Sequence, residues 1–173
     1  MYGGARDVQA VFSSDRIDFM PVSEDLIPEY LVMLNDTERV QRYITRHVRQ
    51  YDEAAERDWV RGKRESHAPI FSMIERATGR FIGNIEYMDR MGDAADLGIA
   101  ITAAQQDKGF GSEAIRRFLT FGFEQLGLEE VRLNVFDDNP RAFHVYEKCG
   151  FTLAGPGREE GDLYMTARRR AAL

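Results

Sequence analysis

Two glycines in a short loop are the first residues of this sequence whose type and spacing could do chemistry. They are Gly109 and Gly111, and a strongly amphipathic stretch follows them. The first N–H groups of a helix have no partner inside the helix and can hold phosphate oxygens, while glycine lets the backbone approach such a ligand closely. The segment therefore predicts a phosphate-binding turn at the start of a helix.

Three kinds of phosphate site compete for this loop. A nucleotide P-loop is excluded, because its G-x-x-x-x-G-K-[ST] pattern is missing and Lys108 precedes the glycines. Residues 109–114 do match the dinucleotide pattern G-x-G-x-x-A. That fold normally begins with its fingerprint, whereas most of this chain precedes residue 109. A dinucleotide-binding oxidoreductase therefore stays as a remote alternative, and the third reading depends on a second run of residues.

This second run, residues 139–151, contains a side chain that could donate a proton. Asn139 and Pro140 favour the start of a helix, and Gly150 favours its end. Between them, Tyr146 carries a phenol with an ordinary pKa of about 10, which is protonated at neutral pH. The same run can also be a capped helix that only packs on a sheet.

Together, the two runs resemble the GNAT superfamily of N-acetyltransferases. Gln106, Gly109 and Gly111 match the family pattern Q/R-x-x-G-x-G/A, and residues 139–151 match N-x-x-A-x-x-x-Y-x-x-x-G-F. The N-terminal half resembles, less specifically, the subgroup that acetylates ribosomal-protein N-termini, spermidine or antibiotics. The resemblance implies an acyltransferase that moves the acetyl group of acetyl-CoA to a primary amine by direct attack in a ternary complex. A GNAT-like sensor or interaction module that binds acetyl-CoA without turnover is the alternative from another class.

The resemblance also implies roles for particular residues. The backbone of residues 99–101 would pair with the pantetheine arm, and the N–H groups of residues 106–112 would hold the pyrophosphate. Tyr146 matches the tyrosine that protonates the departing thiolate, and Asn139 matches a residue that hydrogen-bonds the cofactor arm. The expected cofactor-binding residues are Ile99, Ala100, Ile101, Gln106, Asp107, Lys108, Gly109, Phe110, Gly111, Ser112, Asn139, Arg141, Ala142 and Tyr146.

The group that takes the proton from the amine has two candidates, Glu86 near the end of one expected strand and Asp96 at the start of the next. Each could equally be a solvated carboxylate. The three histidines have no neighbouring Ser, Cys or Asp that suggests a triad. The single cysteine, Cys149, cannot form an internal disulfide, and no Cys or His cluster has the spacing of a metal site.

Strands and helices alternate irregularly around these residues. Hydrophobic periodicity predicts strands at 16–21, 70–75, 81–88, 97–101, 131–135, 151–154 and 163–167, and helices at 23–35, 52–65, 111–126 and 141–148. In the second helix Ala55, Trp59 and Val60 are expected to face inward. This order predicts a mixed α/β domain. The resemblance to the GNAT superfamily implies that its central sheet is mostly antiparallel and splayed, with helices on both faces.

Length and charge limit the remaining possibilities. With 173 residues and 43% hydrophobic content, we expect one GNAT-like domain at 13–173, preceded by a flexible leader or short edge segment at 1–12. The net charge of −6 disfavours nucleic acid and suits an amine-bearing partner. The sequence has neither a membrane-length apolar run nor a secretory signal, so we expect a cytoplasmic monomer or homodimer.

Overall fold

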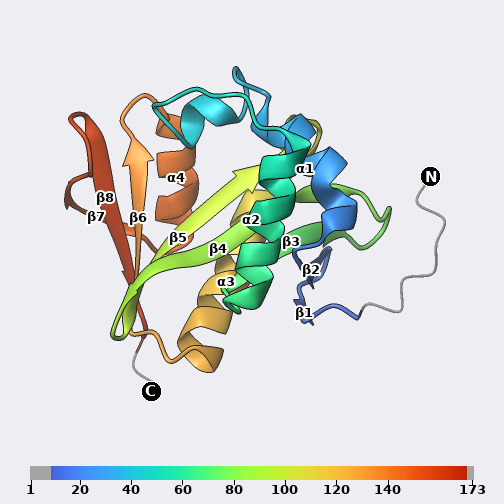
Figure 1. Ribbon diagram of the computed structural model, residues 1–173. Coiled ribbons are helices and arrows are strands. Elements are labelled where there is room, and N and C mark those ends of the chain that lie inside the picture. The colour runs from blue at the N-terminus through green and yellow to red at the C-terminus, as the bar shows by residue number, and fades with distance from the viewer. Residues whose placement is uncertain (1–8, 171–173) are drawn as a thin grey trace. The chain divides into compact units, whose positions relative to one another are not determined.

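The computed structural model describes residues 9–170, and within them eight strands form an open sheet that is accompanied by four α-helices (Figure 1). The strand order is β1-β2-β3-β4-β5-β6-β8-β7. The strands are β1 (Phe12–Ser13), β2 (Ile17–Pro21), β3 (Ile70–Glu75), β4 (Phe81–Met91), β5 (Ala94–Ile101), β6 (Glu130–Phe136), β7 (Thr152–Pro156) and β8 (Asp162–Arg168). The helices are α1 (Ile27–Leu34), α2 (Glu53–Glu65), α3 (Phe110–Gln125) and α4 (Pro140–Lys148). The predicted mixed α/β fold with a mostly antiparallel sheet is confirmed.

The chain forms two compact units. The described residues up to Glu86, together with Ile99–Phe110, make the first unit. Tyr87–Gly98 and the described residues from Gly111 onward make the second. In the described part of the chain, no helix combines the length and the apolar character that crossing a membrane requires.

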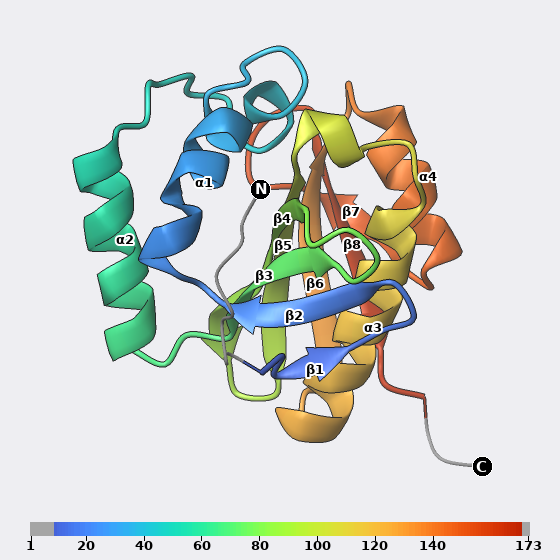
Figure 2. The same cartoon turned by 90° about the vertical axis from the view of Figure 1, so that its right-hand side faces the viewer.

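In the first unit, β1, β2, β3 and the first part of β4 pair antiparallel in sequence order. Helices α1 and α2 lie side by side, as Figure 2 shows. Asp52 caps α2, because its Oδ1 accepts from the Ala55 N–H (2.8 Å). Ser23 caps the short 3-10 helix Glu24–Leu26 that leads into α1, because its Oγ accepts from the Asp25 N–H (3.2 Å). The two helices share one core cluster with the sheet, built from Val22, Leu26, Ile27, Tyr30, Met33, Val40, Val60, Ile70 and Phe81.

The predicted inward face of α2 is right at two positions and wrong at one. Val60 is buried, and Trp59 contacts the core cluster and meets the Tyr30 ring edge-on at 5.8 Å. Ala55 is exposed, and Glu56 is buried in its place. Residues four apart share a helix face, so the burial of Val60 carries Glu56 inward with it.

The end of the leader expected at residues 1–12 belongs to the sheet. Residues 1–8 lie outside the described residues. Phe12 begins β1, where its ring stacks on Phe19 with centroids 4.4 Å apart, and the Val11 N–H donates to the Phe19 carbonyl over 2.9 Å. The strand β1 is therefore an edge strand of the first unit.

In the second unit, β8 pairs antiparallel with both β6 and β7, and β5 pairs parallel with β6. The parallel register joins Ala94, Ala95 and Asp96 to β6, so the later residues of β5 lie beyond it. The strands β4 and β5 are also longer than predicted, since β4 continues to Met91 and β5 begins at Ala94. Gly92 lies in the short turn between β4 and β5, and its left-handed backbone, with φ +63°, allows the chain to reverse directly from one strand into the next.

Helix α3 packs in the second unit against the end of β4. Phe118 is fully buried and stacks on Tyr87 at 4.2 Å, while the Tyr87 hydroxyl donates to the Phe118 carbonyl over 2.7 Å. A side chain at Gly122 would place its Cβ 2.4 Å from Tyr87 Oη. Glycine at this position therefore allows the close approach of helix and strand.

Candidate active site

The loop before α3 is held in shape by contacts within the first unit. Gln106 Nε2 donates to the carbonyls of Ile101 and Arg39, each over 3.0 Å, which ties the loop to the end of β5. Asp107 and Gly109 both adopt left-handed backbone conformations, with φ +62° and +80°. The loop thus turns twice before the helix begins, as a close backbone cradle for an anion requires.

Arg16, the residue before β2, contacts this loop and holds it in place. Its Nη1 donates to the Lys108 carbonyl over 2.9 Å, and its guanidinium lies 4.4 Å from the centroid of the buried Phe110 ring. A Cβ at Gly109 would lie 3.3 Å from Arg16 Nη2. The first N–H groups of an α-helix have no partners inside the helix, so the braced loop leads into backbone donors that can hold an anion.

The expected pantetheine-binding strand is closely approached by its neighbour. Ile99, Ala100 and Ile101 are half-buried at the end of β5. A Cβ at Gly83 of β4 would lie 1.9 Å from the Ala100 carbonyl oxygen, so only glycine fits there. The Thr102 N–H also donates to a β4 carbonyl, that of Ile82, over 2.9 Å. These contacts fix the backbone of the predicted 99–101 segment within the first unit.

Helix α4 of the second unit begins as predicted and leaves its apolar face partly open. Asn139 caps it, since its Oδ1 accepts from the Ala142 N–H over 3.2 Å. None of the described residues of α4 is fully buried, although Ala142, Val145 and Tyr146 are half-buried. This stripe of α4 is therefore partly exposed apolar surface.

Tyr146 and Cys149 lie near one another at the end of α4. The Tyr146 ring meets the Phe151 ring edge-on at 6.0 Å, and burial, with a smaller contribution from Cys149, raises the pKa of Tyr146 to about 12. Burial also raises the pKa of the Cys149 thiol, against the opposing effects of Arg116 and of a hydrogen bond from Sγ to the Ser112 carbonyl (3.7 Å). The phenol therefore holds a proton at neutral pH, and the thiol is not a ready nucleophile.

The two carboxylates proposed as bases have different surroundings. Glu86 accepts from Lys63 Nζ over 2.8 Å, with about a quarter of each side chain exposed. Lys63 belongs to α2, and no sequence pattern predicts its ion pair with Glu86, which lies 23 residues further along the chain. Glu86 is therefore a partly exposed carboxylate with one cationic neighbour.

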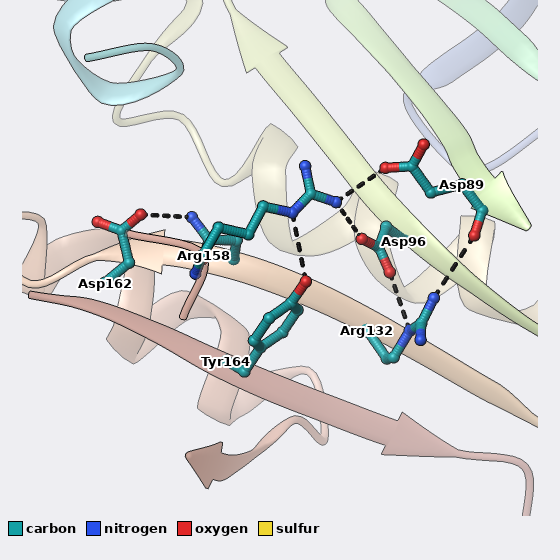
Figure 3. Close-up of polar contacts among 7 residues, drawn as sticks. Asp89, Asp96, Arg132, Arg158, Asp162 and Tyr164 are labelled. Atoms are coloured by element: carbon teal, nitrogen blue, oxygen red, sulfur yellow. Dashed lines mark hydrogen bonds and ion pairs between the residues drawn. The ribbon is translucent and has the colours of Figure 1, made fainter. Parts of the chain in front are cut away.

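Asp96 is the buried centre of an ion-pair network in the second unit (Figure 3). Its Oδ1 lies 2.9 Å from Arg132 Nε and its Oδ2 contacts Arg158 Nη2, while its side chain is 6% exposed. Arg158 also reaches Asp89 (2.9 Å) and donates to the Tyr164 hydroxyl (3.2 Å). The bond to Tyr164 and the contact with Asp96 raise the pKa of Arg158 above its ordinary value, so Asp96 is flanked by two permanent cations.

The same network anchors the loop between β7 and β8. The Arg158 N–H donates to Asn134 Oδ1 over 2.9 Å, and Asn134 Nδ2 donates to Asp162 Oδ2 over 3.0 Å. Gly157 must be glycine, because a Cβ there would lie 2.3 Å from Asn134 Oδ1. Sequence reasoning missed Arg158, since its partners lie on four other elements and no local pattern connects them.

No cluster of three or more His, Cys, Asp or Glu side chains that could hold a metal ion occurs among residues 9–170.

Comparison with known proteins identifies the family of this chain. Residues 16–152 match the family described as Acetyltransferase (GNAT) domain. A spermidine N(1)-acetyltransferase of Vibrio cholerae is 36% identical over 90 residues, which cover 51% of this chain and 52% of that protein. An L-amino acid N-acetyltransferase of Escherichia coli is 28% identical over 81 residues, covering 47% and 50%. The chain thus spans about half the length of these two relatives.

Solved structures share the fold over a greater length. A GNAT-family acetyltransferase from Bacillus anthracis superposes with a TM-score of 0.77 at 19% identity, covering 90% of this chain and 96% of that one. The spermidine N-acetyltransferase of Vibrio cholerae in complex with CoA and spermine gives a TM-score of 0.76 at 20% identity, again covering 90% and 96%. At such identities the likeness concerns the fold alone, and the family assignment follows from the match over residues 16–152: this chain belongs to the GNAT family of acetyltransferases.

Proposed function

We propose that this protein transfers the acetyl group of acetyl-CoA to a primary amine by direct attack within a ternary complex. The observation that carries the proposal is the braced loop at 106–112, whose two left-handed residues precede the start of α3 in a chain of the GNAT family. The mostly antiparallel sheet is incompatible with the dinucleotide-binding alternative, because that fold is built on a mostly parallel sheet.

Cofactor binding is assigned to three segments of the chain. The N–H groups of residues 106–112 would hold the pyrophosphate, with Lys108 as a nearby cation. The backbone of Ile99–Ile101 would pair with the pantetheine arm like an added strand. In the second unit, α4 carries the other residues that we assign to the cofactor: Asn139, Arg141, Ala142 and Tyr146. The fit is supported by the tight backbone at 107–109 and by the half-buried stripe of α4.

Tyr146 is the proposed proton donor. When the amine nitrogen bonds to the thioester carbonyl carbon and the carbon–sulfur bond breaks, the sulfur leaves as a thiolate that needs a proton. The phenol has one to give, because its raised pKa keeps it neutral. Backbone N–H groups would stabilise the negatively charged oxygen of the tetrahedral intermediate, which exists after the amine attacks and before the thiolate leaves.

Glu86 is the proposed acceptor of the amine's proton. It is partly exposed and has a single cationic partner, Lys63, so an incoming ammonium could reach it. Asp96 remains the second candidate, but its side chain is only 6% exposed and each of its oxygens lies close to an arginine. We propose that Asp96 serves chiefly to hold Arg158 and the β7–β8 loop. Separate substitutions, Glu86→Gln and Asp96→Asn, test the two assignments by their pH–rate profiles.

The proposal is tested by measuring thiol release from acetyl-CoA with spermidine, amino acids and short peptides as acceptors. Release that requires both an amine and the protein supports acetyl transfer. Tight binding of acetyl-CoA without release across all of these acceptors would instead support the non-catalytic sensor or interaction module.

A further inference from the structure

A chain of hydrogen bonds crosses the core of the first unit from Ser23, which precedes α1, to β4. The Ser23 N–H donates to Tyr30 Oη over 3.2 Å, and this oxygen lies 2.6 Å from Ser72 Oγ. Ser72 Oγ then donates to Asn84 Oδ1 over 2.7 Å. Tyr30 and Ser72 are completely buried, so water does not compete for these bonds. We call these four residues the Tyr30 relay.

The hydrogen bond that Ser72 donates to Asn84 fixes the direction of the relay. Ser72 has one hydroxyl proton and gives it to Asn84 Oδ1, so Ser72 must accept from Tyr30. Tyr30 in turn accepts from the Ser23 N–H. Burial raises the pKa of Tyr30 above its ordinary value, and the phenol keeps the proton that it donates. The amide of Asn84 is therefore held with Oδ1 toward Ser72 and Nδ2 directed away.

The outward Nδ2 of Asn84 is a fixed donor available to a ligand. Asn84 is half-buried, and none of the described residues accepts a hydrogen bond from its Nδ2. Glu86 stands two residues further along β4, on the same face of the strand and about 7 Å away. One Glu86 oxygen binds Lys63, which leaves the other for a ligand. This face of β4 thus offers a hydrogen-bond donor followed by a carboxylate.

We infer that the acetyl acceptor carries an oxygen close to its amine, as an α-aminoacyl group does in a free amino acid or at a peptide N-terminus. The inference rests on the proposed function, in which Glu86 receives the amine. The amine would meet Glu86, and the neighbouring carbonyl or carboxylate oxygen would accept from Asn84 Nδ2. A polyamine at neutral pH presents protonated nitrogens, which are donors only, so it would leave Nδ2 facing another donor.

The variant Asn84→Asp tests this pairing. It keeps the side-chain shape and an oxygen for Ser72, but it replaces the outward donor with an oxygen. With L-alanine and the dipeptide alanylalanine as acceptors, we expect KM to rise about tenfold or more. With spermidine, KM should stay the same or fall. Gln125→Glu makes the same amide-to-carboxylate change at an exposed position ending α3, and it should alter neither value.

A second variant tests the relay without adding a negative charge to β4, as Asn84→Asp does. Tyr30→Phe keeps the ring in the core but removes the proton donated to Ser72, so Asn84 loses its fixed orientation. We expect KM for the α-aminoacyl acceptors to rise while KM for acetyl-CoA stays unchanged. An unchanged acceptor KM in both variants would overturn the inference.

The wild-type protein gives the decisive comparison. A higher kcat/KM for L-alanine or alanylalanine than for spermidine supports the inference, and the better of the two identifies a free amino acid or a peptide N-terminus as the source. A higher kcat/KM for spermidine overturns the inference and leaves the proposed function standing. Absence of acetyl transfer to any amine overturns the proposed function and the inference with it.

Discussion

Tyr146 keeps its proton because the chain buries it beside Phe151 and Cys149 at the end of α4. Its pKa is raised to about 12, so the phenol remains a donor through the whole neutral range. We expect Tyr146→Phe to lower kcat about 100-fold to 10,000-fold at neutral pH, since the thiolate then leaves without its proton. Thiol release at several pH values measures this loss, and acetyl-CoA affinity should change far less. An unchanged kcat would remove Tyr146 from the reaction.

The burial of Glu56 should affect how the unfolding free energy of the protein depends on pH. It is 4% exposed, and its Oε2 has no hydrogen-bond partner among the described residues. Burial raises its pKa from 4.5, and Asp52 adds to this while Arg49 opposes it. The folded protein then binds this proton more tightly than the unfolded chain, so this carboxyl lowers stability as the pH rises above about 4.5.

Glu56→Gln removes this dependence. We expect the variant to gain about 1 kcal/mol of unfolding free energy relative to the wild type between pH 4.5 and about pH 7. Urea unfolding at both pH values measures the change. Glu65→Gln alters an exposed carboxylate of the same helix and should show a much smaller difference. An equal effect of the two substitutions would contradict the assigned cause.

At the scale of elements, the loop before α3 depends on one backbone conformation. Gly109 has φ +80°, which a β-branched residue rarely adopts, and Arg16 Nη2 lies within 3.3 Å of the place of a Cβ. We expect Gly109→Val to weaken acetyl-CoA binding about tenfold or more by moving the N–H groups of the loop. Calorimetric titration measures the affinity.

Gly79 provides the matched control for this substitution. It lies in the turn between β3 and β4, has φ +72°, and has open space around the place of a Cβ. Gly79→Val should therefore impose similar backbone strain, about 1 to 3 kcal/mol, without changing the affinity for acetyl-CoA. Equal affinity losses in the two variants would indicate general destabilisation rather than a role of the loop.

The elements themselves were largely readable from the sequence, and the partly wrong ones have local causes. Helix α4 and the 70–75 strand follow their hydrophobic periods and their Gly, Pro and Asn boundaries, so local rules suffice for them. The early start of β5 was missed because its first residues are small or acidic and buried by pairing with β6. Ala55 was placed inward because periodicity gives no reason to bury Glu56 instead.

At the scale of the whole molecule, folding brings together residues that no local sequence pattern connects. Gln106 and the 139–151 run could be recognised from the sequence, since each is a short contiguous pattern. The Tyr30 relay and the Arg158 network could not, because they join positions as far apart as Ser23 and Asn84 or Asp89 and Arg158. Such contacts depend on strand register and on burial, which only the folded chain determines.

Binding of acetyl-CoA should stabilise the folded protein as a whole. A ligand that binds only the native state raises the unfolding free energy by about 2.7 kcal/mol at a concentration 100 times its Kd. We therefore expect acetyl-CoA to raise the Tm by several degrees, whereas an equal concentration of NAD leaves it nearly unchanged. Stabilisation by NAD alone would contradict the assignment of the 106–112 loop.

The central claim, that the protein moves an acetyl group onto an amine, is tested most directly by following the acetyl carbon itself. The protein is incubated with acetyl-CoA labelled with carbon-13 in the acetyl group and with an equimolar mixture of L-alanine, alanylalanine and spermidine, and the products are analysed by mass spectrometry. The account predicts labelled N-acetyl product that forms with the wild type and is strongly reduced with Tyr146→Phe. Label that stays on CoA or appears only as free acetate, with the wild type folded and binding acetyl-CoA, would contradict it.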